Sequence, residues 1–504
     1  MSNWRTIALC AALAVIVGAT AESCLGGANF NQQSVGDQPR GVKVGVGDIA
    51  VSKQGYLVFE ADGRLAVAWP DDRRARPLPV EKPTRLAFAD GRPVVYAHSA
   101  ADGAVHAVDV RRREKLWSAS IDVATASDEN STQLRRLHLV SSNDDSRVVT
   151  VWRDEMYIVE TDGGNLIAHR EFPEPVIDTK LTADSSRAIA VLDHTWQGEN
   201  REKPRTRVEI VELEGGSTRT VTVPNCSDRI TLDDNAAKAF LAPTRCNPPT
   251  GGAHDPISVV DLERGSESFV RNLPGFGPVE MAPRGHVAVG FVDAANVDPS
   301  LFDDRSQIPP APDESADDGD GPGRVRESGE PGEGKPRYYL MVIDTSTLDY
   351  ELHAYGDELP RYAMTPDGGV LLVDNFGGED QRLQRFDTDT GEFRPFRGPP
   401  IMLNKFVMTG DSRRAYAIYS SDVDEPNSKN ALYEVDIPGA QVSEMPLEFE
   451  PANINISPDD RRLYLRDARK NDRNEVLCAY SLAMERCTQI IQLGSAVQGK
   501  GPSG

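Results

Sequence analysis

The segments TPDGGVLLVDN at residues 365–375 and LQRFDTDTGEF at residues 383–393 decide the fold of this chain. In the first, a polar Asp-Gly turn separates two short apolar runs, which is the chemistry of a β-hairpin. In the second, an apolar strand ends at the acidic residue Asp387 and is followed by another turn and another strand. Together the two segments predict a unit of four short antiparallel strands.

This unit recurs along the chain. The strand that ends in an acidic residue reappears as AVHAVDV (104–110), MYIVETDGG (156–164), VEIVELEGG (208–216), ISVVDLERG (257–265), LMVIDT (340–345) and LYEVDIPG (432–439), and Ser481 takes the acidic position in CAYSL (478–482). Consecutive copies lie 43 to 52 residues apart except across one insertion. Four antiparallel strands in repeated units of about 45 residues are typical of a β-propeller, which packs its blades face to face around an axis.

We therefore predict an all-β fold, with a β-propeller over residues 44–493. Eight units are delimited near residues 83–121, 134–174, 175–224, 225–274, 275–358, 359–400, 401–450 and 451–493. Residues 44–82 hold a degenerate copy, which is either a further blade or a source of strands that close the last one. The count falls to seven if one unit is irregular.

Three segments lie outside this pattern. Residues 303–337 are acidic and almost free of apolar side chains, so we predict a disordered insertion within one blade. Residues 25–43 are predicted to form a flexible linker and residues 494–504 a flexible tail.

Residues 1–24 have the pattern of an export signal, with Arg5 before an apolar core at 7–18 that is too short to span a bilayer. Cleavage after Ala21 would fit the small-x-small rule, whereas Ala21-Glu22-Ser23-Cys24 resembles a loose lipobox that ends in a lipidated cysteine. We expect an exported protein, either a periplasmic or outer-membrane lipoprotein anchored through Cys24 or a secreted one.

The other cysteines favour an oxidising compartment. Cys10 lies within the signal, and the four that remain besides Cys24 form an even set. A two-residue turn at Leu482-Ala483 would place Cys478 opposite Cys487. Pairing Leu232 with Phe240 and Ile230 with Ala242 would place Cys226 opposite Cys246. We predict these two disulfides.

The balance of charge excludes one class of partner. The chain has 55 basic and 78 acidic residues and a net charge of −23, which repels nucleic acid. Contact with a membrane is expected only through the possible lipid, and the chain is expected to be a monomer.

The repeats at 365–393 and SPDDRRLYLRD at 457–467 resemble the YVTN-type propeller repeats of bacterial surface and periplasmic proteins. That family includes binding proteins and lactonase-like enzymes, so the resemblance implies a fold rather than a reaction. AVDVRRREKLW at 107–117 is also similar to the tryptophan-docking repeat of quinoprotein-like propellers, which implies that Trp117 packs between two blades.

The expected functional surface is the face on which the second and third strands of each unit are joined. Those connections are long and varied, and variable loops on a rigid scaffold are where binding usually resides. A carboxylate stands near the end of the second strand in five units and could hold a divalent cation such as calcium, or could cap its own loop as an Asx-turn. These carboxylates are Asp154, Asp193, Asp293, Asp374 and Asp467, and the same face is expected to carry His194, Trp196, His254, Asp255 and Asn375.

The sequence is compatible with two functions. The first is a non-enzymatic binding or scaffold protein that takes a protein, peptide or glycan through these loops. The alternative is a lactonase-like hydrolase that uses carboxylates and a histidine near the central channel, with or without a metal.

Overall fold

A computed structural model describes most of the strands and tight turns of the chain. The described residues are 42–43, 49–61, 63–69, 74–121, 137–193, 205–223, 226–227, 229–233, 237–241, 256–274, 280–281, 287–293, 338–356, 360–374, 383–399, 401, 405–419, 431–445, 447, 449, 451–467 and 476–492. The predicted insertion at 303–337, the tail and the signal lie outside them, as does the linker apart from its last two residues.

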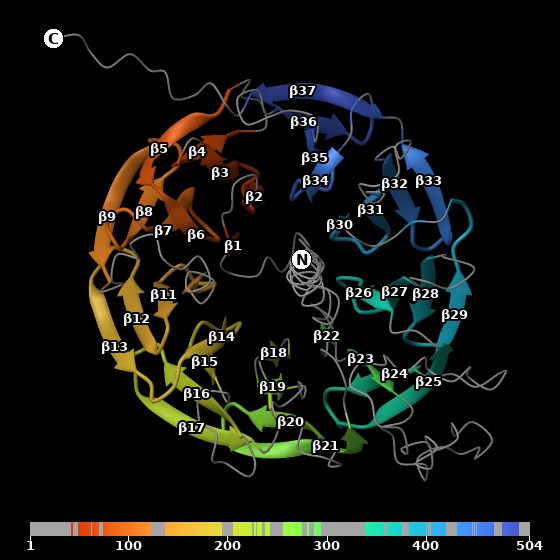
Figure 1. Cartoon of the computed structure of the whole chain (residues 1–504), viewed down its shortest axis with the longest axis horizontal. Coiled ribbons are helices and arrows are strands. Elements are labelled where there is room, and N and C mark those ends of the chain that lie inside the picture. The colour runs from red at the N-terminus through yellow and green to blue at the C-terminus, as the bar shows by residue number, and fades with distance from the viewer. Residues whose placement is uncertain are drawn as a thin grey trace, which may run out of the picture.

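The described strands form nine antiparallel sheets arranged as blades around a central axis (Figure 1). Blade A contains β2 (Ile49–Val51), β3 (Leu57–Ala61), β4 (Arg64–Ala68) and β5 (Arg76–Glu81); blade B contains β6 (Pro83–Phe88), β7 (Val94–Ser99), β8 (Ala104–Asp109) and β9 (Glu114–Ser120); blade C contains β10 (Leu137–Ser141), β11 (Arg147–Trp152), β12 (Glu155–Glu160) and β13 (Leu166–Glu171). Blade D contains β14 (Val176–Leu181), β15 (Arg187–Leu192), β16 (Thr206–Glu212) and β17 (Thr218–Val223); blade E contains β18 (Thr231–Leu232), β19 (Lys238–Leu241), β20 (Pro256–Asp261) and β21 (Ser266–Pro274); blade F contains β22 (Glu280–Met281), β23 (Val287–Asp293), β24 (Tyr338–Asp344) and β25 (Tyr350–Gly356). Blade G contains β26 (Arg361–Met364), β27 (Val370–Asp374), β28 (Leu383–Asp387) and β29 (Glu392–Pro395); blade H contains β30 (Lys405–Met408), β31 (Arg414–Tyr419), β32 (Ala431–Asp436) and β33 (Gln441–Met445); blade I contains β34 (Pro451–Ile456), β35 (Arg462–Asp467), β36 (Val476–Ser481) and β37 (Arg486–Gln492).

The all-β propeller is confirmed, but the predicted count of eight blades, or seven, is wrong. The described chain forms nine, because the degenerate copy at residues 44–82 builds blade A as a complete sheet of its own. Of the two readings given for residues 44–82, the further blade is therefore the correct one, although its third strand, β4, does not end in the acidic residue that marks the other copies. A short strand, β1 (Val42–Lys43), lies inside the ring against β6, with Val42 opposite Leu86.

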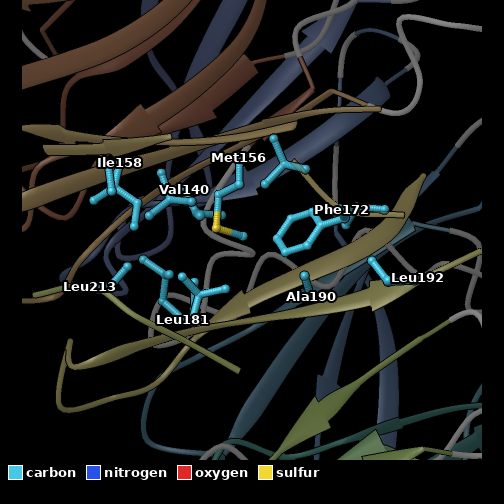
Figure 2. Close-up of a cluster of buried hydrophobic side chains, with 14 residues drawn as sticks. Val140, Met156, Ile158, Phe172, Leu181, Ala190, Leu192 and Leu213 are labelled. Carbon is cyan, nitrogen blue, oxygen red and sulfur yellow. The ribbon is translucent and has the colours of Figure 1, made fainter. Parts of the chain in front are cut away.

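Apolar packing between blades holds the ring together. The described residues form nine hydrophobic clusters, and each cluster joins two neighbouring blades. Figure 2 shows the cluster between blades C and D, where Met156 and Phe172 meet Leu181 and Leu192. Alternate side chains of every strand point to opposite faces, so each blade can contribute to the cluster on either side.

The ring closes by the same packing. Tyr464 and Leu477 of blade I lie in one cluster with Leu57 and Phe59 of blade A. Within the described residues no strand of one end completes a sheet of the other. Closure therefore depends on side-chain burial at one interface.

The acidic residue of the repeat is a turn cap. Asp109, Asp261, Asp344 and Asp387 each accept hydrogen bonds from the backbone N–H groups two and three positions later. An Asp side chain that bonds to its own turn in this way stabilises the connection from the third to the fourth strand.

The glycine that ends the turn between the third and fourth strands contacts a side chain of the preceding blade in several blades. Gly164 has φ +72°, and a Cβ added there would lie 2.8 Å from the Trp117 ring. Trp117 donates its indole N–H to the Thr161 carbonyl at 2.6 Å and stacks on Tyr96. The expected packing of Trp117 between two blades is thus found, between blades B and C. Arg170 over Gly216 and Arg219 over Gly265 repeat the arrangement.

The structure contains the predicted disulfide between Cys478 and Cys487, with 5.6 Å between the Cα atoms. The register that we predicted for it is wrong, because Cys487 lies opposite Tyr480 and Cys478 lies opposite Ile490. The connecting turn has four residues, 482–485, instead of two, and the register shifts at Ala479.

The register predicted for β18 and β19 is also wrong, by one residue, since Thr231 and not Leu232 lies opposite Phe240. Cys226 is buried and disulfide-bonded, and its predicted partner Cys246 lies outside the described residues. No helix in the described part of the chain is long and apolar enough to cross a membrane.

Candidate binding face

The two faces of the ring differ in the length of their connections. We call the face that carries the links between second and third strands the loop face, and the opposite face, which carries the remaining turns within each blade, the hairpin face. On the loop face, blades A, B and C have connections of two to four residues, at 62–63, 100–103 and 153–154. The six consecutive blades D to I all have long ones, bounded by the strand ends at 192 and 206, 241 and 256, 293 and 338, 374 and 383, 419 and 431, and 467 and 476. The loop face is therefore asymmetric around the ring.

The five predicted carboxylates all lie near the ends of second strands on this face, but in five different blades. Asp193 and Asp374 are buried, and Asp154 lies in the tight turn between β11 and β12. Among the described residues no three His, Cys, Asp or Glu side chains gather into a group that could hold a metal ion. The side chains of Asp293 and Asp467 are not described, so a divalent cation at this face stays a prediction.

The residues predicted for the binding loops and for lipidation belong to segments beyond the described strands. His194, Trp196, His254, Asp255 and Asn375 lie outside the described residues, as does Cys24. The structure describes the strand ends from which these loops depart.

The hairpin face is joined from blade to blade by hydrogen bonds between turns. In blade H, the Thr409 hydroxyl donates to Asp411, which also accepts the backbone N–H of Arg413. The next turn residue, Ser412, has φ +61° and accepts the backbone N–H of Asp367 in blade G at 3.0 Å. Asp145, Ser185 and Asp460 make the same kind of link to the preceding blade.

A polar row crosses the inner strands of blades B, C and D. Arg85 is buried and donates its Nε–H to the Leu137 carbonyl at 2.6 Å. Burial lowers the pKa of His138, and the nearby carboxylate of Asp178 opposes that effect. Asp178 also accepts the backbone N–H of Ile230 in blade E at 3.0 Å, so the row links four blades near the axis.

A buried carboxylate group lies between blades C and D. Glu174 is 6 % exposed, and one of its oxygens lies 3.4 Å from Arg207 Nη1. Burial raises the pKa of Glu209, which accepts the Thr220 hydroxyl at 2.9 Å. Glu174 follows β13 and Arg207 lies near the start of β16, so the group stands at the loop face, at the base of the 193–205 connection.

The sequence offers only weak signals for these polar groups. Arg85, His138 and Asp178 lie on the first strands of three successive blades, β6, β10 and β14, and their proximity comes from the packing of blades. Glu174 stands between two prolines in FPEPV, a sign of an ordered link between blades that the repeat pattern alone did not single out.

No family model matches the chain, and no curated protein matches it. Several solved structures do, among them a eukaryotic initiation factor, with 11 % identity over 84 % of this chain and 92 % of that one at a TM-score of 0.49. Another is BamB from Moraxella catarrhalis, with 11 % identity over 85 % and 96 % at a TM-score of 0.39. A third is an oligogalacturonate lyase in complex with manganese, with 11 % identity over 88 % and 98 % at a TM-score of 0.38. The resemblance of this chain to bacterial β-propeller repeat proteins holds at the level of the fold and says nothing of its chemistry.

Proposed function

We propose that this chain is an extracytoplasmic binding or scaffold protein that holds a protein, peptide or glycan on its loop face. The observation that carries the proposal is the run of six consecutive blades with long connections on one face. Each connection starts and ends on a strand of a blade held by two apolar interfaces, so the strand ends that bear the connections stand at fixed positions around the axis. A rigid scaffold with variable loops is the usual arrangement of a binding surface.

The location is supported by cysteine chemistry. The Cys478–Cys487 bond and the bonded state of Cys226 suit an oxidising compartment, where structural disulfides persist. The charged flank and apolar core at residues 1–24 fit export with processing near residues 21–24.

The proposal can be tested by shortening one loop. Residues 194–204 are replaced by a two-residue turn like that of Arg153 and Asp154, which joins β11 to β12 in blade C. Partners are then captured by crosslinking in the native cells, and the purified protein is applied to peptide and glycan arrays. We expect the variant to lose at least one ligand or partner that the parent chain retains.

A matched control changes the hairpin face. Replacing the β24–β25 turn at residues 345–349 by an Asp-Gly turn should leave every ligand in place. Equal losses in both variants, or a parent chain that captures nothing in either assay, would count against binding through the loop face. Thermal unfolding verifies that both variants are folded.

A further inference from the structure

Three side chains of blade B form a continuous chain of hydrogen bonds. Ser118 on β9 lies directly across from His106 on β8, with 2.8 Å between Ser118 Oγ and His106 Nδ1. The other ring nitrogen, Nε2, lies 3.0 Å from a carboxylate oxygen of Asp102 in the turn between β7 and β8. A hydroxyl, an imidazole and a carboxylate connected in this order are the signature of an activated nucleophile.

The proton positions follow from the chemistry of the partners. Asp102 in its ionised form can only accept, so Nε2 of a neutral imidazole carries the proton and Nδ1 accepts the Ser118 hydroxyl. Burial lowers the pKa of His106 and keeps the ring neutral. Hydrogen bonds from Ser99 and His106 overcome the effect of burial and lower the pKa of Asp102. The ring is thus oriented as a base toward the serine.

Of the three residues, the nucleophile Ser118 can be reached from solvent, whereas the base His106 is shielded from it. Ser118 is exposed on β9, the outermost strand of the blade, whereas His106 is 2 % exposed. The neighbouring second-to-third connection has only four residues, 100–103. Because β9 is an edge strand among the described residues, alternate backbone N–H groups beside Ser118 point away from the ladder and can donate to an oxyanion.

We propose that Ser118 is a serine nucleophile that accepts acyl groups from esters at the outer edge of blade B. His106 acts as the general base, and Asp102 is a positioning residue that holds the ring. This activity is independent of ligand binding through the loop face.

Besides the ester, water is the only reactant that the reaction needs. Ser118 Oγ forms a bond to the ester carbonyl carbon as its proton passes to His106 Nδ1. The bond from that carbon to the leaving alkoxide breaks, and the alkoxide takes the proton from His106 to leave as the alcohol. Water then attacks the acyl-serine, gives a proton to His106, and releases the carboxylic acid while Ser118 recovers its hydrogen.

The experiment is covalent labelling of the purified full-length chain with a fluorophosphonate probe, which phosphonylates activated serines. Peptide mass spectrometry should locate the adduct at Ser118. Ser118→Ala should abolish it, and Ser120→Ala, on the same exposed strand but opposite Ala104, should not affect it. His106→Gln should slow labelling by about 100-fold or more.

The role of Asp102 is tested by pH. Asp102→Asn should change the pH profile of labelling, which a purely structural residue would not move. Two other titratable groups act on the ring, His98 on β7 and Lys115 on β9. The neighbouring strand β5, which packs against β7, β8 and β9, carries the charged residues Arg76 and Glu81.

A second pair of variants keeps the test valid if a change at the buried histidine unfolds the chain. Ser118→Cys should react with iodoacetamide at least tenfold faster than Ser120→Cys, since only the former has an imidazole partner. Equal rates for the two thiols, or no fluorophosphonate adduct at Ser118 above that of the unfolded chain, would overturn the proposal.

Discussion

Burial sets the charge of the histidines in blade B. His98 is 1 % exposed, and its Nδ1 lies 2.6 Å from the Thr84 hydroxyl. Burial lowers the pKa of His98 from 6.5 to about 4, so the ring is neutral in the folded chain. In the unfolded chain His98 takes up a proton as the pH falls through about 6.5, whereas in the folded chain it takes up a proton only at about pH 4.

This difference predicts a pH-dependent stability. The stability that His98 contributes is present above pH 6.5 and is lost as the pH falls toward about 4. His98→Gln removes the titrating group and should make the fall in unfolding free energy between pH 7 and pH 5 shallower, although His106 and His138 still add to it. Denaturant titrations at the two pH values measure the change. An unchanged slope would contradict the prediction, and His169→Gln, at a partly exposed site, is the control.

In the turns of the hairpin face, a single residue adopts a left-handed backbone conformation and also bonds to the preceding blade. Asp145, Ser185, Ser412 and Asp460 all have positive φ, a conformation that glycine adopts without strain. Each nevertheless carries an oxygen that bonds to the preceding blade. We therefore expect the link between blades to offset the backbone strain at these positions.

Substitutions at Ser412 separate the two effects. Ser412→Ala keeps the strained backbone and removes the acceptor for the Asp367 N–H, so we expect a loss of about 1 kcal/mol. Ser412→Gly removes the same bond but relieves the strain, so its loss should be smaller. Chemical unfolding of both variants shows which one loses more unfolding free energy. An alanine variant as stable as the parent would show that the link contributes nothing.

The whole ring depends on the interface between its two ends. Tyr464 of blade I is 1 % exposed and lies in the cluster with Leu57 and Phe59 of blade A. Tyr416, equally buried, lies between blades H and I and is a matched comparison away from the closure.

Tyr464→Ala should open the ring at that interface, with a loss of about 3–5 kcal/mol for a truncated aromatic core residue. Hydrogen exchange should rise in blade A, at one end of the sequence, as well as in blade I at the other. Tyr416→Ala should raise exchange in blades H and I and leave blade A protected. If exchange in blade A does not respond to Tyr464→Ala, closure does not depend on this contact.

The sequence by itself determined the four-stranded unit, its hairpin turns and the acidic caps such as Asp387, because these depend on residues only a few positions apart. It also indicated the disulfide of the last hairpin, since Cys478 and Cys487 lie close along the chain. Tertiary structure alone decided the ninth blade, because residues 44–82 depart from the repeat and are held by packing on both sides. It likewise decided the register around Tyr480, where a longer turn shifts the pairing, and the meeting of Ser118, His106 and Asp102, because cross-strand neighbours are known only once the register is known.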